Sequence, residues 1–485
     1  MLLISIGRLA QFVLLLLTLR VATSLLSPFE MGKISIVTAT VAFFALLLLN
    51  PVGMFMNRRM HAWDARGQVK QYFAYFWKYL VAVSISAGLI LAGLVWWGIW
   101  TPSIGIDWLL ALVCGNLLFA TVGQVVIPGL NMFGHRGWFT VLTVVMAAMS
   151  LIFAVALTVT ISARAEYWLS GLLIGQLIVG LIGMKIFFGK LHHADIGCPP
   201  PQLSHLHLKH LMRFVWPVAL AVGLGWIQSQ GYRYIMESRI GLVELGLFVA
   251  GFGISSGLIA GFESMFSAYF QPKFYRRVSK DSLSEQSQAW IEYAQNILPA
   301  LFLTSVFIMA TAPELTKLLL GSNFKQSSEF VIWGAFAELA RVSTVVYGLA
   351  AQARMNTKLL LLPNFLSAVT AVLLVWFLTP LYGSDGVGFS LVSSALIALL
   401  ATAYVNKKYL AITLPLNHFW KSAVMGGGLL LLATVLRLSM GNDGSYFMAI
   451  AMLFMVGSVF MLFQFVMLLP VLKAEAIIPH NPDKN

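Results

Sequence analysis

Long apolar segments follow one another along almost the whole chain, and this pattern limits the possible folds. A helix needs roughly 20 predominantly apolar residues to cross the hydrocarbon layer of a membrane, and only helices and closed barrels satisfy their backbone groups there. By this criterion the sequence contains about fourteen candidate spanning helices. They lie near residues 3–26, 32–56, 73–98, 107–131, 137–161, 166–189, 213–238, 245–270, 291–312, 326–350, 358–380, 386–405, 417–437 and 445–470. The sequence therefore predicts an all-α polytopic membrane protein.

Composition agrees with a membrane location and excludes several functions. Hydrophobic residues make up 59% of the chain and charged residues only 10%, whereas about a quarter of a soluble domain is charged. The net charge of +13 does not indicate nucleic-acid binding, because Lys and Arg of polytopic proteins gather in cytoplasmic loops. Two cysteines provide neither a disulfide framework nor metal-ligand spacing. We expect no metal, no cofactor and no nucleic-acid partner.

Basic residues are concentrated in alternate loops, which predicts the orientation of the chain. One set of loops contains Arg58 and Arg59, the basic residues of 273–280, and Lys407 with Lys408. The positive-inside rule places these loops and both termini in the cytoplasm. The opposite loops, such as residues 100–105 and 382–385, are too short to form a catalytic domain. We therefore expect that the protein is not an enzyme.

A short motif with an E-x-G step occurs twice, before the second and the eighth predicted spans. The first copy is Ser27-Pro28-Phe29-Glu30-Met31-Gly32, and the second contains Glu244-Leu245-Gly246. An even number of spans separates the copies, so the repeats are parallel and related by an axis along the membrane normal.

The repeat predicts two lobes of about six helices each in a parallel pseudo-repeat, followed by two C-terminal helices. The expected limits are 1–190 for the N-terminal lobe, 191–212 for a cytoplasmic linker, 213–406 for the C-terminal lobe, 407–470 for the last two helices and 471–485 for a cytoplasmic tail.

Two arginines lie inside apolar segments just before the two copies of the motif. Arg20 is in the first predicted span and Arg233 in the seventh. A charge within a membrane segment is costly and marks a candidate functional site, and the planar guanidinium binds two phosphate oxygens at once. We predict that both arginines line a cavity and bind an anionic substrate. A helix-packing ion pair, or extension of the side chains to the outer headgroups, is the alternative.

Three further arginines are candidate substrate ligands with simpler alternatives. Arg8, in the inner half of the first span, can equally reach the cytoplasmic surface. Arg58 and Arg59, at the inner end of the second span, are first of all orientation signals and can also gather an anionic headgroup.

Charged residues also occur inside the eighth and tenth predicted spans. Glu338 and Arg341 are three residues apart on one helix face and can pair with each other. Glu263 has no such neighbour, so it needs a partner from another helix (Arg20 or Arg233) or must be protonated. We predict that Glu263 and Glu338 couple transport to an ion, and that Arg341 contributes to substrate binding.

Several motifs in order make the chain similar to a known family. They are Gly7-Arg8, residues 27–32, Glu244-Leu245-Gly246, residues 318–324 and residues 380–386. The chain resembles the oligosaccharide-lipid (Wzx-type, O-antigen or polysaccharide) flippases of the multidrug/oligosaccharidyl-lipid/polysaccharide exporter superfamily.

This resemblance implies two six-helix lobes around a central cationic cavity that opens alternately to each side. The implied cargo is an undecaprenyl-pyrophosphate-linked oligosaccharide, moved across the bacterial inner membrane from the cytoplasmic to the periplasmic leaflet. A polysaccharide polymerase and a chain-length regulator are implied partners. Three alternatives are a drug or metabolite/cation antiporter of the same superfamily, a membrane polymerase or ligase, and a scaffold subunit of an envelope polysaccharide machine.

Overall fold

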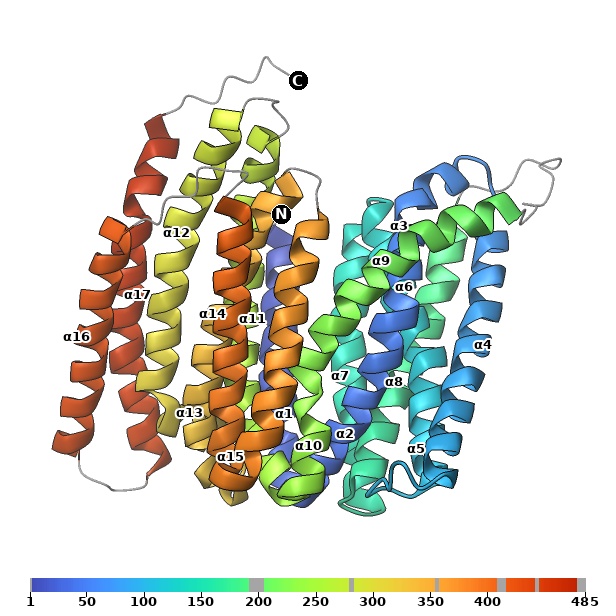
Figure 1. The fold of residues 1–485 in the computed structure, drawn as a ribbon, viewed down its shortest axis with the longest axis horizontal. Coiled ribbons are helices and arrows are strands. Elements are labelled where there is room, and N and C mark those ends of the chain that lie inside the picture. The colour runs from blue at the N-terminus through green and yellow to red at the C-terminus, as the bar shows by residue number, and fades with distance from the viewer. Residues whose placement is uncertain are drawn as a thin grey trace. The chain divides into compact units, whose positions relative to one another are not determined.

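The computed structural model describes residues 2–191, 205–278, 283–353, 357–407, 416–440 and 445–477. Within these residues all regular structure is helical (Figure 1). The elements are α1 Leu2–Leu25, α2 Pro28–Phe44, η1 Ala45–Leu49, α3 Asn50–Asp64, α4 Val69–Trp96, α5 Ile106–Gly115, η2 Asn116–Ala120, α6 Thr121–Met132, α7 Arg136–Thr160, α8 Ala165–Lys190, α9 His205–Gln230, α10 Tyr232–Arg239, α11 Leu242–Val278, α12 Leu283–Ala310, α13 Ala312–Leu319, η3 Ser322–Ser327, α14 Ser328–Ala353, η4 Thr357–Leu360, α15 Leu361–Lys407, α16 Leu416–Met440 and α17 Tyr446–Ile477. The predicted all-α membrane fold is confirmed.

Twelve helical stretches of the described residues are long and apolar enough to cross a membrane. Two differences from the predicted spans account for the lower number. The predicted spans 358–380 and 386–405 both lie in α15, which has a non-helical backbone at Gly383 (φ 57°, ψ −137°). The predicted span 213–238 is divided between α9 and α10, which are not among the twelve. The chain is an integral membrane protein.

Contacts divide the chain into two compact units, Met1–Val249 and Ala250–Asn485. The boundary falls inside α11. Helices α9 and α10, predicted to open the second lobe, pack against α2 in the first unit, and α9 also packs against η1 and α3. The predicted lobe limits therefore stay a prediction, and most of the predicted linker 191–212 lies outside the described residues.

The first unit is built around apolar side chains from α3 to α6. Met60, Leu80, Leu109 and Ile127 are almost completely buried. On α4, Leu89 is 69% exposed. Exposed aliphatic side chains on a membrane helix suit contact with lipid, so this surface of α4 fits the hydrocarbon layer.

A π-helical turn joins α2 to α3 within one long stretch of the first unit. It spans Ala45–Leu49 and is followed by Pro51, which has no backbone N–H. The Tyr79 hydroxyl on α4 donates to the Leu48 carbonyl at 2.8 Å. A side chain of the neighbouring helix thus satisfies a carbonyl of the irregular turn.

In the second unit, the C-terminal helices α16 and α17 run beside α12 (Figure 1, red and yellow). The Gln464 amide on α17 donates to the Ala300 carbonyl at 2.9 Å and to Thr304 Oγ1 at 3.1 Å. On α16, an Arg437 Nη nitrogen lies 2.9 Å from Glu314 Oε2 on α13. Because a buried polar group is costly unless it is paired, these bonds fix the C-terminal pair to the unit.

The two copies of the E-x-G motif contact each other within the first unit. A Cβ atom on Gly246 would lie 1.8 Å from the Pro28 carbonyl oxygen, and one on Gly32 would lie 2.2 Å from the Leu242 carbonyl oxygen. The contact is reciprocal, because each glycine faces the carbonyl one helical turn before the other glycine. Only residues without a side chain allow two helix backbones to approach so closely.

We predict that Gly246→Ala lowers the stability of the purified protein, by about 1–3 kcal/mol, because the added methyl group forces α2 and α11 apart. Gly253→Ala on the same helix is the matched control. No atom lies within 4 Å of a Cβ there, so alanine should raise stability slightly through its better helix propensity. Thermal unfolding in detergent measures both variants. Equal melting temperatures for the two would contradict the close contact.

Candidate functional site

Arg233 lies in the first turn of α10, directly after the helix is interrupted at Gly231. An Nη nitrogen of Arg233 donates to the Ser35 carbonyl at 3.1 Å and to Thr38 Oγ1 at 3.4 Å, both on α2. The buried Nε nitrogen has no hydrogen-bond partner. Arg233 therefore links α10 to α2 and retains one unused donor.

Arg20 lies in α1 and is partly buried. Its backbone carbonyl accepts hydrogen bonds from Ser24 Oγ at 2.7 Å and Thr23 Oγ1 at 3.2 Å. Helix α1 continues past Arg20 to Leu25, whereas the seventh predicted span is interrupted at Gly231. The two arginines matched by the repeat are thus carried by different local backbones.

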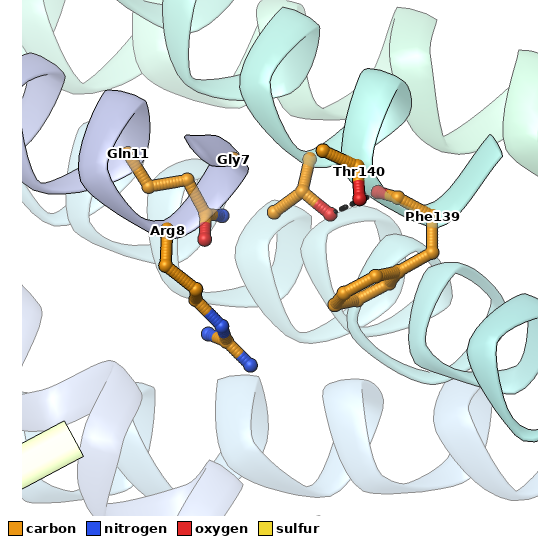
Figure 2. A pocket seen from close by; sticks show the side chains of 6 residues that line it. Gly7, Arg8, Gln11, Phe139 and Thr140 are labelled. Atoms are coloured by element: carbon orange, nitrogen blue, oxygen red, sulfur yellow. Dashed lines mark hydrogen bonds between the residues drawn. The ribbon is translucent and has the colours of Figure 1, made fainter. Parts of the chain in front are cut away.

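Arg8 lies beside a shallow pocket between α1 and α7 (Figure 2). Its side chain is exposed, with Cζ 5.8 Å from the centroid of the Phe139 ring. Figure 2 shows Arg8 and Gln11 extending from α1 on the side that faces Phe139 and Thr140 of α7. The pocket offers a cation and an amide, both able to bind an anionic or hydroxylated group.

Arg58 and Arg59 are exposed on α3. The Arg59 guanidinium lies 5.3 Å from the Phe55 ring centroid, a cation–π distance. Within the described residues, Arg8, Arg59 and Arg233 have no carboxylate partner. The first unit therefore carries arginines whose charge no acidic side chain of the described chain neutralises.

In the second unit, Arg341 on α14 binds two carboxylates. Its Nε donates to Glu338 Oε2 at 2.6 Å, and an Nη nitrogen donates to Glu263 Oε2 on α11 at 3.0 Å. The predicted local pair of Glu338 and Arg341 is present. Glu263 has a partner from another helix, as expected, but this partner is Arg341 and neither Arg20 nor Arg233, because α11 and α14 bring Glu263 to Arg341. The roles of these three residues in coupling and substrate binding stay predictions.

Sequence reasoning missed a charged cluster at the N-terminal ends of α2 and α8. Glu30 Oε1 lies 3.1 Å from Lys33 Nζ, and Glu30 Oε2 accepts the Ala165 backbone N–H at 2.7 Å. Lys33 Nζ also lies 3.7 Å from Glu166 Oε1. The sequence shows acidic residues where α2 and α8 begin. It does not show that these two helix ends, more than a hundred residues apart in the chain, lie close together. In the described part of the chain, no three His, Cys, Asp or Glu residues could hold a metal ion.

Comparison with known proteins identifies the fold. No family model and no curated protein matches the sequence. The lipid II flippase MurJ, in an inward closed conformation, matches with a TM-score of 0.67 and 14% identity over 97% of this chain and 100% of that chain. A multidrug resistance MATE family transporter of the MOP superfamily, in an inward-facing conformation, matches with a TM-score of 0.60 and 16% identity over 83% and 92% of the two chains. A MOP superfamily transporter from Pyrococcus furiosus matches with a TM-score of 0.51 and 15% identity over 84% of this chain and 92% of that chain. The chain therefore has the fold of MOP superfamily transporters.

We predict that Arg341→Met destabilises the protein by about 1–3 kcal/mol, because two carboxylates lose their charged donor inside a membrane span. The triple variant Arg341→Met, Glu263→Gln, Glu338→Gln should recover much of this loss, since no charge then remains unpaired in the cluster. Melting temperature and yield in detergent measure the cycle. A triple variant as unstable as the single one would show that Arg341 acts through packing and not through charge.

Proposed function

We propose that this protein is a flippase of the bacterial inner membrane. It moves undecaprenyl-pyrophosphate-linked oligosaccharide units from the cytoplasmic to the periplasmic leaflet by alternating access, with both chain termini in the cytoplasm. The observation that carries the proposal is that Arg8, Arg59 and Arg233 of the first unit have no carboxylate partner among the described residues. A cation with a buried donor in a membrane helix, as in Arg233, is costly unless an anionic ligand pairs with it.

The chemistry of the cargo fits the chain in two respects. Pyrophosphate presents the oxygens that guanidinium groups bind in bidentate fashion, and the apolar helix surfaces suit a prenyl tail. The fold likeness to MurJ, described as a lipid II flippase, supports a lipid-linked cargo. A polysaccharide polymerase and a chain-length regulator would then be the partners that use the exported units.

Each arginine has a proposed part in this transport. Arg20 and Arg233 hold the pyrophosphate inside the membrane, and the unused Nε of Arg233 is the donor available for it. Arg8, Arg58 and Arg59 attract the headgroup from the cytoplasmic side. Arg341 is the weaker candidate of the set, because its charge is already compensated by Glu338 and Glu263, which accept hydrogen bonds from two of its nitrogens.

The second candidate is a drug or metabolite/cation antiporter, which the likeness to a MATE family transporter favours. A pocket for cationic compounds would need carboxylates available to the ligand. Glu263 and Glu338 are each bound to Arg341, so the flippase accounts better for the charges.

These two carboxylates, Glu263 and Glu338, are proposed to take part in ion coupling, as the sequence suggested. Glu263→Gln should then lower the dependence of transport on a proton gradient in vesicles containing the purified protein, and unchanged dependence would remove this role.

We predict that Arg20→Ala and Arg233→Ala each reduce transport by about tenfold or more, the loss expected for a charge-assisted hydrogen bond. Surface glycan on cells that carry each variant as their sole copy gives a first measurement. Movement of a lipid-linked oligosaccharide across vesicles containing the purified protein gives the direct one. Arg164→Ala, an exposed position just before α8, is the matched control.

Protein level and melting temperature are measured alongside transport, because Arg233 also links α10 to α2. Normal glycan display with both Arg20→Ala and Arg233→Ala would exclude these arginines as substrate ligands. If a lipid-linked oligosaccharide crosses the membrane equally fast in vesicles with the purified protein and in protein-free vesicles, the flippase function itself is excluded.

A further inference from the structure

The C-terminal part of α11, in the second unit, presents a stripe of four exposed side chains. They are Met265, Tyr269, Lys273 and Arg276. Their spacing of i, i+4, i+8 and i+11 places all four on one face of the helix. Met265 is 73% exposed and Tyr269 43% exposed, and both cations are exposed as well. Along this stripe the surface changes from apolar to aromatic to cationic toward the end of the helix.

The other side of the same part of α11 packs against α12. Phe274 is only 3% exposed, and its ring centroid lies 5.7 Å from that of Tyr293. Trp290, one helical turn before Tyr293, is completely buried in the same apolar cluster. These contacts fix the rotation of α11 about its own axis, so the stripe stays on the exposed side of the helix.

Tyr269 and Lys273 contact each other within the stripe. Lys273 Nζ lies 4.0 Å from the centroid of the Tyr269 ring, a cation–π distance. The ring thus holds the ammonium close to the helix surface. The positive-inside rule concerns charge alone and requires no aromatic partner, so orientation of the chain does not account for this arrangement.

The charge of the stripe is positive, and carboxylates nearby do not balance it. The stripe carries two cations and no carboxylate. Arg277, which lies off the stripe, binds Glu292 of α12. With Glu285 in the first turn of α12, the described residues of these two helix ends hold three cations and two carboxylates. An anionic group is therefore the complementary ligand for the stripe.

We propose that the stripe binds an anionic phospholipid of the surrounding bilayer, of the phosphatidylglycerol type. Met265 and Arg276 are about 16 Å apart along the helix axis. Hydrocarbon, the interface where aromatic rings gather, and phosphate follow each other in the same order in a membrane. The acyl chain lies along Met265, and the glycerol ester groups lie beside Tyr269. Lys273 and Arg276 donate charge-assisted hydrogen bonds to the phosphate oxygens.

A lipid with a net negative charge suits this site better than a zwitterionic one. A zwitterionic headgroup carries a cation of its own, which Lys273 and Arg276 repel, whereas basic residues at a membrane surface attract anionic lipids. The basic loops predict that this end of α11 faces the cytoplasm, so the lipid belongs to that leaflet. The site uses none of the arginines proposed to bind the cargo, and it neither requires nor tests the flippase function.

Photo-crosslinking locates the lipid on the chain. Purified protein in nanodiscs is exposed to a phosphatidylglycerol with a photoreactive headgroup, and mass spectrometry of the peptides measures the yield on residues 265–276. We expect unlabelled phosphatidylglycerol to compete for this site and phosphatidylcholine to compete poorly. Lys273→Gln and Arg276→Gln should each weaken binding about fivefold, the contribution of one cation near an anionic surface, and the double variant should lose the preference for the anionic lipid.

Arg277→Gln is the matched control, because it removes one positive charge from the same turn of α11 but off the stripe. This variant should keep the crosslink and the preference for phosphatidylglycerol. Melting temperatures in detergent without added lipid show that all variants are folded. Wild-type yield in the double variant, or equal competition by phosphatidylcholine, would overturn the proposal. Competition by a lipid-linked oligosaccharide at lower concentration than phosphatidylglycerol would also overturn it, since the stripe would then be a cargo site.

The part played by the aromatic ring has its own test. Tyr269→Leu should weaken binding of phosphatidylglycerol by about two- to fivefold, the size of an exposed cation–π contact, because the Lys273 ammonium is no longer held in place. Tyr269→Phe keeps the ring and should bind like the wild type. If both variants bind equally well, the ring does not position the ammonium, and this part of the proposal fails.

Discussion

The close approach of α2 and α11 at Gly32 and Gly246 is the constraint on which the first unit depends. Neither glycine could carry even a methyl group without meeting a backbone carbonyl. Such an approach replaces side-chain packing by direct contact between backbones, and membrane helices favour it because lipid provides no hydrophobic force to press them together. Arg233 and Tyr234 add polar bonds to the same helix, at Ser35 and Thr40. The N-terminal half of α2 is thereby held by several short contacts.

The distribution of charge differs between the two units. In the second unit, Arg341 lies between Glu338 and Glu263, and Arg437 binds Glu314. In the first unit, Arg8, Arg59 and Arg233 face aromatic rings, backbone carbonyls or hydroxyls, which do not cancel a charge. A transporter for an anion needs attraction that is not already satisfied by its own side chains. The arginines of the first unit meet this requirement better than Arg341 does.

The sequence was most informative about features that depend on local pattern. Runs of apolar residues predicted the helices, and the i,i+3 spacing of Glu338 and Arg341 predicted their pair. Features set by distant contacts were not predictable in this way. The partner of Glu263 comes from another helix, 78 residues along the chain, and Glu166 acquires its partner Lys33 only when α8 packs on α2. The interruption at Gly231 was also missed, although Ser229, Gln230 and Arg233 form a polar stretch around this glycine that could have suggested a break in the helix.

The π-helical turn between α2 and α3 determines which way the side chains of α3 face relative to those of α2. A π turn contains about one residue more than an α turn, so every side chain after it is rotated by about 100° relative to an uninterrupted helix. Arg58 and Arg59 lie beyond this turn, and Gly32 and Ser35 before it. A helical wheel drawn straight through the segment would therefore assign the arginines to the wrong side. Insertion or deletion of a single residue at Ala45–Leu49 would redirect these cations while leaving the helix pair at Gly32 in register.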